Sequence, residues 1–214
     1  MKKTKNIIQD KIINFYNQNN KTTKINDTQW SLWCKWEKSN QEKEEIIIEA
    51  ILTQQTNWNN VEKAFNNLKK AKKNSLDIIN NTSEKELKKL IKPAGFYQRK
   101  VQYLKNIAKL FINNGIVNSQ KISTNILRQN LLNIKGVGKE TADSILLYAF
   151  NRPIFVIDNY TKKWLKDFKI PVKNPDYDYL QKFFSQQLPK KARFYQQFHA
   201  FIVLYYKNNK NNKK

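Results

Sequence analysis

The most informative part of this chain is the segment Leu131–Trp164, LLNIKGVGKETADSILLYAFNRPIFVIDNYTKKW. The chain holds four glycines, and two of them, Gly136 and Gly138, lie two residues apart between segments of helical character. Glycine lets the main chain approach where a Cβ atom would collide, so amides at such a turn can bind a phosphate. Further along, the apolar run Ile154–Ile157 leads to a carboxylate, Asp158. The sequence therefore predicts a backbone grip for nucleic acid followed by a candidate catalytic acid.

Apolar side chains recur at helical spacing along most of the chain. Trp58, Val61, Phe65 and Leu68 are one such series, and no segment of four or more residues alternates as a strand would. Spacing of three and four residues is typical of an amphipathic helix. The sequence therefore predicts an all-α protein.

Capping residues and prolines give the expected helix boundaries. Ser83 and Glu86 form a capping-box pattern, and Pro93 ends the helix that follows. The pair Asn174–Pro175 is typical of a helix start, with an N-cap followed by proline in the first turn. The last helix is expected over about residues 191 to 206.

The net charge points to a polyanionic partner. The 40 Lys and Arg residues exceed the 17 Asp and Glu residues, giving a formal charge of +23. Neutralised phosphates release counterions, so such a charge favours DNA or RNA binding. A general bias of this chain toward Lys, Asn and Ile is the other explanation, and the charge alone does not separate the two.

Cysteine usage and hydropathy indicate an intracellular protein. Cys34 is the only cysteine, so an intrachain disulfide is impossible and a buried, inert thiol is expected. The N-terminus lacks the apolar core of a signal peptide, and no run of about 18 apolar residues occurs. A cytoplasmic, nucleoid-associated protein is expected.

The ordered motifs resemble the endonuclease III superfamily of DNA glycosylases, which carries a helix-hairpin-helix, a Gly/Pro-rich loop and an aspartate. The further matches resemble the branch of endonuclease III-related proteins and 3-methyladenine DNA glycosylase III. The resemblance covers roughly residues 28 to 206. Besides the opening stretch it is carried by Ile51–Trp58 (ILTQQTNW), Val61–Ala64 (VEKA), Pro93–Tyr97 (PAGFY) and Phe198–Ala200 (FHA).

The resemblance implies two helical domains with a DNA-binding cleft between them. Residues 42–150 would form a six-helix domain with the helix-hairpin-helix at about 127–145. Residues 1–41 and 151–206 would form the second helical domain. The basic segment 207–214, KNNKNNKK, has no core residues and is expected to be a disordered tail.

Asp158 is the catalytic candidate. Breaking an N-glycosidic bond builds positive charge on the sugar, which a nearby carboxylate can stabilise while it orients a water molecule. The alternative is a plain N-cap for the helix expected over 160–168. One side chain can perform both roles.

Glu140 stands where bifunctional members of the superfamily carry the lysine that forms an imine with the sugar. A carboxylate cannot form a Schiff base, so the lyase route loses its nucleophile. Lys139 is adjacent, but neighbouring helical residues point about 100° apart, so it should not substitute. An acid favoured at a helix start is the alternative role of Glu140.

The hairpin is expected to hold DNA through its backbone, with added charge from two lysines. By resemblance its carbonyl oxygens, at Ile134 and Gly136, can also hold K⁺ or Na⁺ against a phosphate. A bare Gly-Val-Gly turn would be weak support, since helix connections use glycine routinely. The predicted DNA-binding residues are Gln55, Lys135, Gly136, Val137, Gly138, Lys139 and Thr141.

Base flipping requires a plug for the vacated stack and a pocket for the extruded ring. Gln55 matches the superfamily position of the plug. Trp58 matches an aromatic that stacks on the flipped base, and an indole face attracts a cationic alkylated purine. Core packing at the start of an apolar stripe is the alternative for Trp58.

This branch carries a pair of pocket tryptophans near the sequence positions of Trp30, Trp33 and Trp36. Trp33 and Trp36 are the pocket candidates, although their spacing also suits a buried helix face. His199, the sole histidine, is expected to make a structural hydrogen bond rather than to catalyse. One cysteine cannot supply a four-thiolate iron–sulfur cluster, and no zinc pattern occurs.

The sequence thus predicts a cofactor-free, monomeric, monofunctional DNA glycosylase acting on damaged double-stranded DNA. Alkylated purines such as 3-methyladenine are the expected lesion. Two alternatives stay open: a glycosylase with AP lyase activity on oxidised pyrimidines or abasic sites, and a non-catalytic helix-hairpin-helix protein that only binds DNA.

Overall fold

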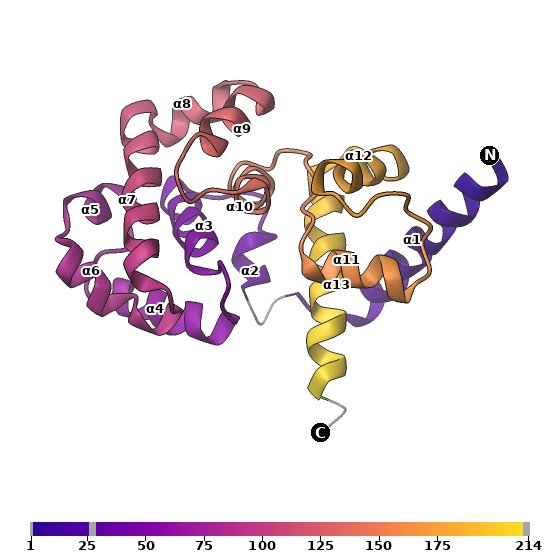
Figure 1. The fold of residues 1–214 in the computed structure, drawn as a ribbon, viewed down its shortest axis with the longest axis horizontal. Coiled ribbons are helices and arrows are strands. Elements are labelled where there is room, and N and C mark those ends of the chain that lie inside the picture. Colours follow the sequence, from indigo (N-terminus) through magenta and orange to yellow (C-terminus); the bar gives the residue numbers. More distant parts are fainter. Residues whose placement is uncertain (1, 26–28, 212–214) are drawn as a thin grey trace. The chain divides into compact units, whose positions relative to one another are not determined.

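The computed structural model describes residues 2–25 and 29–211, and these residues form helices and loops without a strand (Figure 1). The prediction of an all-α fold is confirmed. The chain divides into two compact units, Glu37–Phe150 and Met1–Trp36 with Asn151–Lys214. No helix among the described residues is long and apolar enough to cross a membrane.

The unit of residues 37–150 is built around two long helices. Its elements, all within the described part of the chain, are α3 (Asn40–Leu52), α4 (Trp58–Lys70), α5 (Leu76–Asn81), α6 (Glu84–Leu90), η1 (Lys92–Ala94), α7 (Tyr97–Asn114), α8 (Ile116–Lys121), α9 (Thr124–Leu132), α10 (Lys139–Ser144) and η2 (Ile145–Ala149). More α-helices occur than the six expected, because α5, α6 and α8 are short helices with starts of their own.

Helix α3 is the buried centre of this unit. Ser39 and Glu42 form a reciprocal capping box at its N-terminus. Every residue from Glu45 to Leu52 is buried. It contacts α4, α7, α8, α10 and η2. Its C-terminal end is therefore held in place, and Gln54 and Gln55 follow directly after it.

The hairpin helices α9 and α10 overlap the predicted 127–145 region, and α9 begins at Thr124, before that region. Helix α10 continues into η2, a π-helical turn whose residues are all buried. A bidentate ion pair links the two helices, since the Arg128 Nε and Nη2 atoms donate to Asp143 at 2.7 and 3.1 Å. The Asp143 side chain is fully buried, so this pair fixes how α9 and α10 meet.

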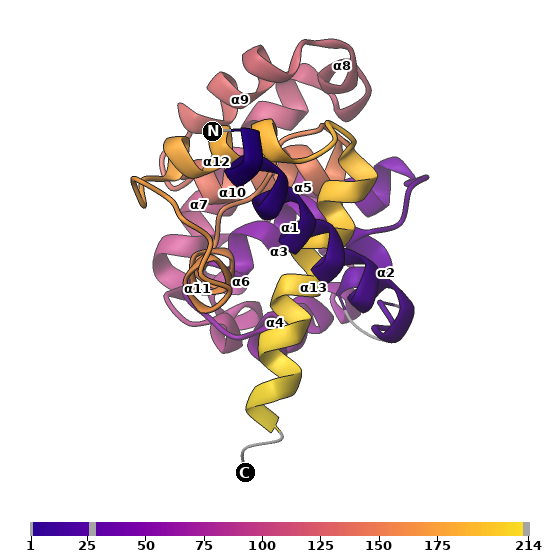
Figure 2. The same ribbon diagram turned by 90° about the vertical axis from the view of Figure 1, so that its right-hand side faces the viewer.

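The other unit contains α1 (Lys2–Thr22), α2 (Trp30–Trp33), α11 (Asn159–Asp167), α12 (Tyr177–Gln187) and α13 (Ala192–Asn211). Helix α13 contacts α1 and α11, and α12 contacts α1 (Figure 2). Aromatic rings fill the core, with Phe15 packed edge-on against Trp164, Phe168, Phe198 and Tyr205.

Two predicted helix boundaries in this unit are wrong. Helix α12 begins at Tyr177 because Asn174 forms a local turn, its Oδ1 atom accepting from the Asp176 amide at 2.8 Å. Helix α13 continues to Asn211, so residues 207–211 of the expected disordered tail are helical. Tyr206 anchors the preceding turn through a 2.8 Å bond to Asp167. Residues 212–214 lie outside the described residues.

Cys34 also differs from expectation. It is half-buried instead of buried, and it lies at the C-terminal end of α2, directly after Trp33. Its Sγ atom lies 3.7 Å from the carbonyl oxygen of Gln196.

Candidate active site and nucleic-acid grip

The hairpin turn exposes Gly138 and buries Val137 before it. Gly136 has φ +99°, and a Cβ atom there would overlap the ring of Tyr103. Val137 is buried and anchors the turn in the core. Gly138 has an ordinary φ, and a Cβ atom there would meet nothing within 4 Å. Glycine at position 138 therefore leaves open the space that an approaching phosphate would need.

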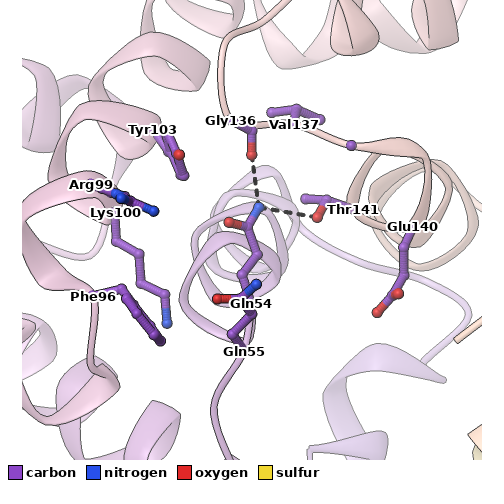
Figure 3. A pocket seen from close by; sticks show the side chains of 11 residues that line it. Gln54, Gln55, Phe96, Arg99, Lys100, Tyr103, Gly136, Val137, Glu140 and Thr141 are labelled. Carbon is purple, nitrogen blue, oxygen red and sulfur yellow. Dashed lines mark hydrogen bonds between the residues drawn. The ribbon is translucent and has the colours of Figure 1, made fainter. Parts of the chain in front are cut away.

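Gln54 braces this turn from the end of α3. Its Nε2 atom donates to the carbonyl oxygen of Gly136 at 2.9 Å and to the Thr141 hydroxyl at 3.1 Å (Figure 3). A single amide thus joins both sides of the hairpin turn to the central helix. This role of Gln54 could not be predicted, because the sequence does not show which of the two adjacent glutamines faces the hairpin.

A pocket of about 470 Å³ lies beside the turn (Figure 3). It is lined by residues that follow α3, residues at the start of α7 and the hairpin itself. These are Gln54, Gln55, Phe96, Arg99, Lys100, Tyr103, Gly136, Val137, Gly138, Glu140 and Thr141. Six of the predicted positions, Gln55, Gly136, Val137, Gly138, Glu140 and Thr141, are therefore gathered at one pocket.

Two residues of this pocket have an unusual backbone conformation. Gln55 (φ +52°) and Phe96 (φ +45°) are both left-handed, and Phe96 is 57% exposed. A non-glycine residue in this region is strained, and such strain is concentrated at functional sites. An exposed phenylalanine beside an exposed glutamine is a surface that could enter a base stack. Phe96 lies in the motif Pro93–Tyr97, but nothing in the sequence marked its side chain as functional.

Lys100 lies beneath the same pocket and is almost fully buried. Its Nζ atom donates to the carbonyl oxygens of Leu52 at 2.7 Å and Ala94 at 2.8 Å. Burial lowers the pKa of Lys100 to about 8. The amine satisfies carbonyl groups that the ends of α3 and η1 leave open.

Three charged residues beside the hairpin turn are at the surface. Lys135, Lys139 and Glu140 are exposed, whereas Thr141 is buried. The Lys135 carbonyl oxygen accepts from Asn106 at 3.3 Å. The position predicted to match the superfamily's lyase lysine therefore presents an exposed carboxylate.

The two carbonyl groups predicted to hold a monovalent cation already accept hydrogen bonds. The Ile134 oxygen accepts from the Val137 amide at 3.0 Å, and the Gly136 oxygen accepts from Gln54. Each carbonyl oxygen has a second lone pair, so both could still ligate an ion. Among the described residues, no group of three or more His, Cys, Asp or Glu side chains gathers as a metal site.

Asp158 lies in the other unit, where it caps α11. Its Oδ1 atom accepts from the Thr161 amide at 2.7 Å, so the N-cap role is confirmed, with the helix beginning one residue earlier than expected. The side chain retains 14% of its exposure. Burial raises the pKa of Asp158, but the charge and hydrogen bond of His199 and the Thr161 bonds outweigh burial and lower the pKa. Asp158 is therefore ionised at neutral pH.

His199 is the nearest titratable partner of Asp158. Its Nε2 atom lies 3.4 Å from Asp158 Oδ2, and its side chain is 6% exposed. Trp30, also buried, packs edge-on against the His199 ring with a centroid distance of 5.9 Å. The sequence alone had no means of pairing His199 with Asp158, because 41 positions separate them.

The burial of the tryptophans differs from what the sequence pattern predicted. Trp30 and Trp33 are both buried and contact each other at 6.0 Å, whereas Trp36 is 45% exposed. The alternative of a buried face shared by Trp33 and Trp36 is wrong, because α2 ends at Trp33. Trp58 begins α4 and is half-buried, while Val61 after it is buried as expected. Trp58 does not line the pocket beside the hairpin.

Comparison with known proteins places the chain in a family. Residues 48–190 match the HhH-GPD superfamily of base excision DNA repair proteins. The chain is 45% identical over 164 residues to the Methanocaldococcus jannaschii protein named "Putative DNA repair glycosylase MJ1434", a span of 74% of each chain. The chain belongs to the HhH-GPD superfamily, and its class is that of the DNA glycosylases of base excision repair.

Two solved structures illustrate the similarity. The 3-methyladenine DNA glycosylase (MagIII) of H. pylori, bound to 1,N6-ethenoadenine, is 30% identical with a TM-score of 0.68, covering 77% of this chain and 85% of that one. A trapped endonuclease III–DNA covalent intermediate has a TM-score of 0.72 at 18% identity, covering 94% of this chain and 85% of that one. The second comparison establishes the shared fold only.

Proposed function

We propose that the protein is a monofunctional DNA glycosylase that hydrolyses the N-glycosidic bond of alkylated purines such as 3-methyladenine. The observation that carries the proposal is Asp158, a carboxylate that stays ionised in a largely buried site because His199 and Thr161 compensate it. An ionised carboxylate stabilises the positive charge that builds on the sugar as the base leaves.

The lowered pKa of Asp158 favours electrostatic stabilisation over proton abstraction. A general base works best with a pKa near the operating pH, whereas Asp158 holds a proton less readily than an ordinary carboxyl group. An alkylated purine suits such a site, because its positive charge already weakens the bond to the sugar. The H. pylori 3-methyladenine glycosylase, at 30% identity, supports the same class of lesion.

Glu140 supports hydrolysis without strand cleavage. It is exposed at the pocket beside the hairpin, at the position where the superfamily's lyase lysine would stand. A carboxylate offers no amine for an imine with the sugar. The product would then be an abasic site in an uncut DNA strand.

The hairpin and the pocket beside it would hold the DNA. The Gly138 backbone and the exposed Lys135 and Lys139 would bind phosphates. Gln55 would replace the flipped base in the stack, and the exposed Phe96 would wedge between bases beside it. A monovalent cation on the Ile134 and Gly136 oxygens would add a bridge to a phosphate.

Base release from methylated DNA tests the proposal. The protein should liberate 3-methyladenine, identified by chromatography, and Asp158→Asn should abolish release while it keeps its affinity for DNA. Borohydride should trap no covalent adduct. A trapped adduct would show the lyase alternative, and equal release by Asp158→Asn would remove Asp158 from the mechanism. DNA binding without release of any base would favour the non-catalytic alternative.

A further inference from the structure

Both oxygens of the Asp158 carboxylate have a polar neighbour. Oδ1 accepts from the backbone amide of Thr161 at 2.7 Å, and Oδ2 lies 3.4 Å from His199 Nε2. The amide belongs to α11 and the imidazole to α13, so the carboxylate is held between two helices. The bond from the Thr161 amide fixes one oxygen, and the His199 ring borders the other.

The His199 ring is itself held in place. Trp30 packs against it edge-on, and so does Phe155, with ring centroids 6.2 Å apart and planes at 89°. Only 6% of the imidazole side chain is exposed. His199 is thus too enclosed to reach a DNA phosphate, and its effect on a reaction would pass through Asp158.

We propose that His199 is a positioning residue, whose imidazole holds the Asp158 carboxylate in a single orientation. This inference rests on the proposed function, in which Asp158 stabilises the developing sugar cation. Each carboxylate oxygen has further lone pairs beyond those that His199 and Thr161 occupy. Those lone pairs remain available to a sugar or a water molecule.

The electrostatics favour this role. The Asp158 side chain is 14% exposed, so the carboxylate loses most of its hydration. An uncompensated charge there would lower the stability of the fold. The groups of α11 and α13 that act on it are the Thr161 amide, His199 and Lys207, a lysine that also interacts electrostatically with Asp158. The His199 imidazole approaches the carboxylate within 4 Å, with 3.4 Å between Nε2 and Oδ2.

Two substitutions separate positioning from simple core packing. His199→Phe keeps a planar ring among Trp30 and Phe155 but removes the donor, and His199→Gln keeps a side-chain donor but removes the imidazole. Asp158→Asn is the reference for loss of the carboxylate. Thermal melting confirms that each variant folds before it is assayed.

The assay is single-turnover release of 3-methyladenine from methylated DNA between pH 5 and 9. His199→Phe should lower the rate at neutral pH roughly 10- to 100-fold, the scale expected when a reacting group is misplaced. The acid limb of its pH profile should move to higher pH, because burial then raises the pKa of Asp158 without the opposing effect of His199. His199→Gln should recover part of the rate but keep the shifted acid limb.

Binding provides the second readout. All variants should retain their affinity for DNA that carries a non-hydrolysable abasic analogue, because His199 does not reach the surface. A folded His199→Phe protein with the rate and the acid limb of the unchanged chain would overturn the inference. A rate loss matched by an equal loss of DNA affinity would also overturn it, since that result would indicate general damage to the fold.

The contact itself can be tested without DNA. His199 is the only histidine, so its ring signals in an NMR spectrum need no assignment among rivals. Asp158→Asn should change their chemical shifts at fixed pH, and unchanged shifts would overturn the contact. If the unchanged chain releases no base while the ring shifts respond, the proposed function fails and the catalytic role of His199 falls with it. If release depends on Asp158 and not on His199, only this inference fails.

Discussion

Among single residues, Asp158 and Lys100 are two poorly exposed charged groups with different surroundings. Asp158 receives partners that keep its charge, whereas Lys100 is bound by carbonyl groups and its pKa is lowered by burial. Both lie next to candidate functional surfaces. A perturbed titratable group beside a pocket is a recognised sign of a functional site, although Lys100 itself has a clear structural task.

The pH dependence of stability tests the burial of Lys100. Its folded-state pKa of about 8 is below that of a free lysine, so between about pH 8 and 10 the unfolded chain binds more protons. The contribution of Lys100 to the free energy of unfolding should therefore rise with pH across that window and be absent below it. Urea unfolding at pH 7 and pH 9.5 should show this rise.

Lys100→Met isolates that contribution. Lys43 and Lys207 also have lowered pKa values, so the decisive quantity is the difference between the unchanged chain and the variant. The rise between the two pH values should be smaller in Lys100→Met. An equal rise in both proteins would show that Lys100 is not desolvated in solution.

Glu140 allows a gain-of-function prediction. Glu140→Lys places an amine at an exposed position of the pocket, where the superfamily's lyase lysine would stand. The variant should form an adduct with abasic DNA that borohydride traps, because the amine can form an imine with the opened sugar. Gel electrophoresis measures the adduct. Glu140→Gln is the control, and absence of an adduct in Glu140→Lys would move the reaction centre away from this residue.

At the scale of elements, the hairpin uses its two glycines for different purposes. Gly136 is required by the protein itself, because its positive φ and the Tyr103 ring both exclude a side chain. Gly138 has no such internal constraint. The two positions therefore form a matched pair for separating folding from DNA binding.

Alanine at each position should produce opposite defects. Gly136→Ala should lower the free energy of unfolding by at least about 1–2 kcal/mol from the backbone alone. Gly138→Ala should cost less than about 1 kcal/mol, the scale of an N-cap change, but weaken DNA binding roughly tenfold. Urea unfolding and fluorescence anisotropy measure the two effects. Unweakened DNA binding by Gly138→Ala would place the phosphate elsewhere.

The elements that the sequence predicted best are those with local signals. The hairpin, the capped start at Ser83 and the helix after Asp158 all follow from residues within a few positions of one another. Asn174 misled the prediction because its side chain serves equally in an N-cap and in a turn. Contacts between distant segments, such as His199 with Asp158 or Gln54 with Gly136, have no local signal and required the structure.

At the scale of the whole molecule, the charge of +23 has two explanations, a DNA-binding face and a general excess of lysine. The structure offers a way to separate them, because exposed lysines occur both at the hairpin and on α6. Lys135 and Lys139 flank the turn, and Lys85 and Lys89 lie exposed on α6. Replacing either pair with glutamine removes the same formal charge.

The salt dependence of DNA binding decides between the explanations. If Lys135 and Lys139 each neutralise a phosphate, their replacement should reduce the slope of log K against log salt by up to about 1.8, since each contact contributes about 0.9. Replacement of Lys85 and Lys89 should leave the slope nearly unchanged, because a lysine that touches no phosphate releases no counterion. Titrations by anisotropy between low and moderate salt measure both slopes. Equal reductions of the slope in the two variants would mean that the excess charge acts diffusely. The hairpin lysines would then not be a specific phosphate-binding site.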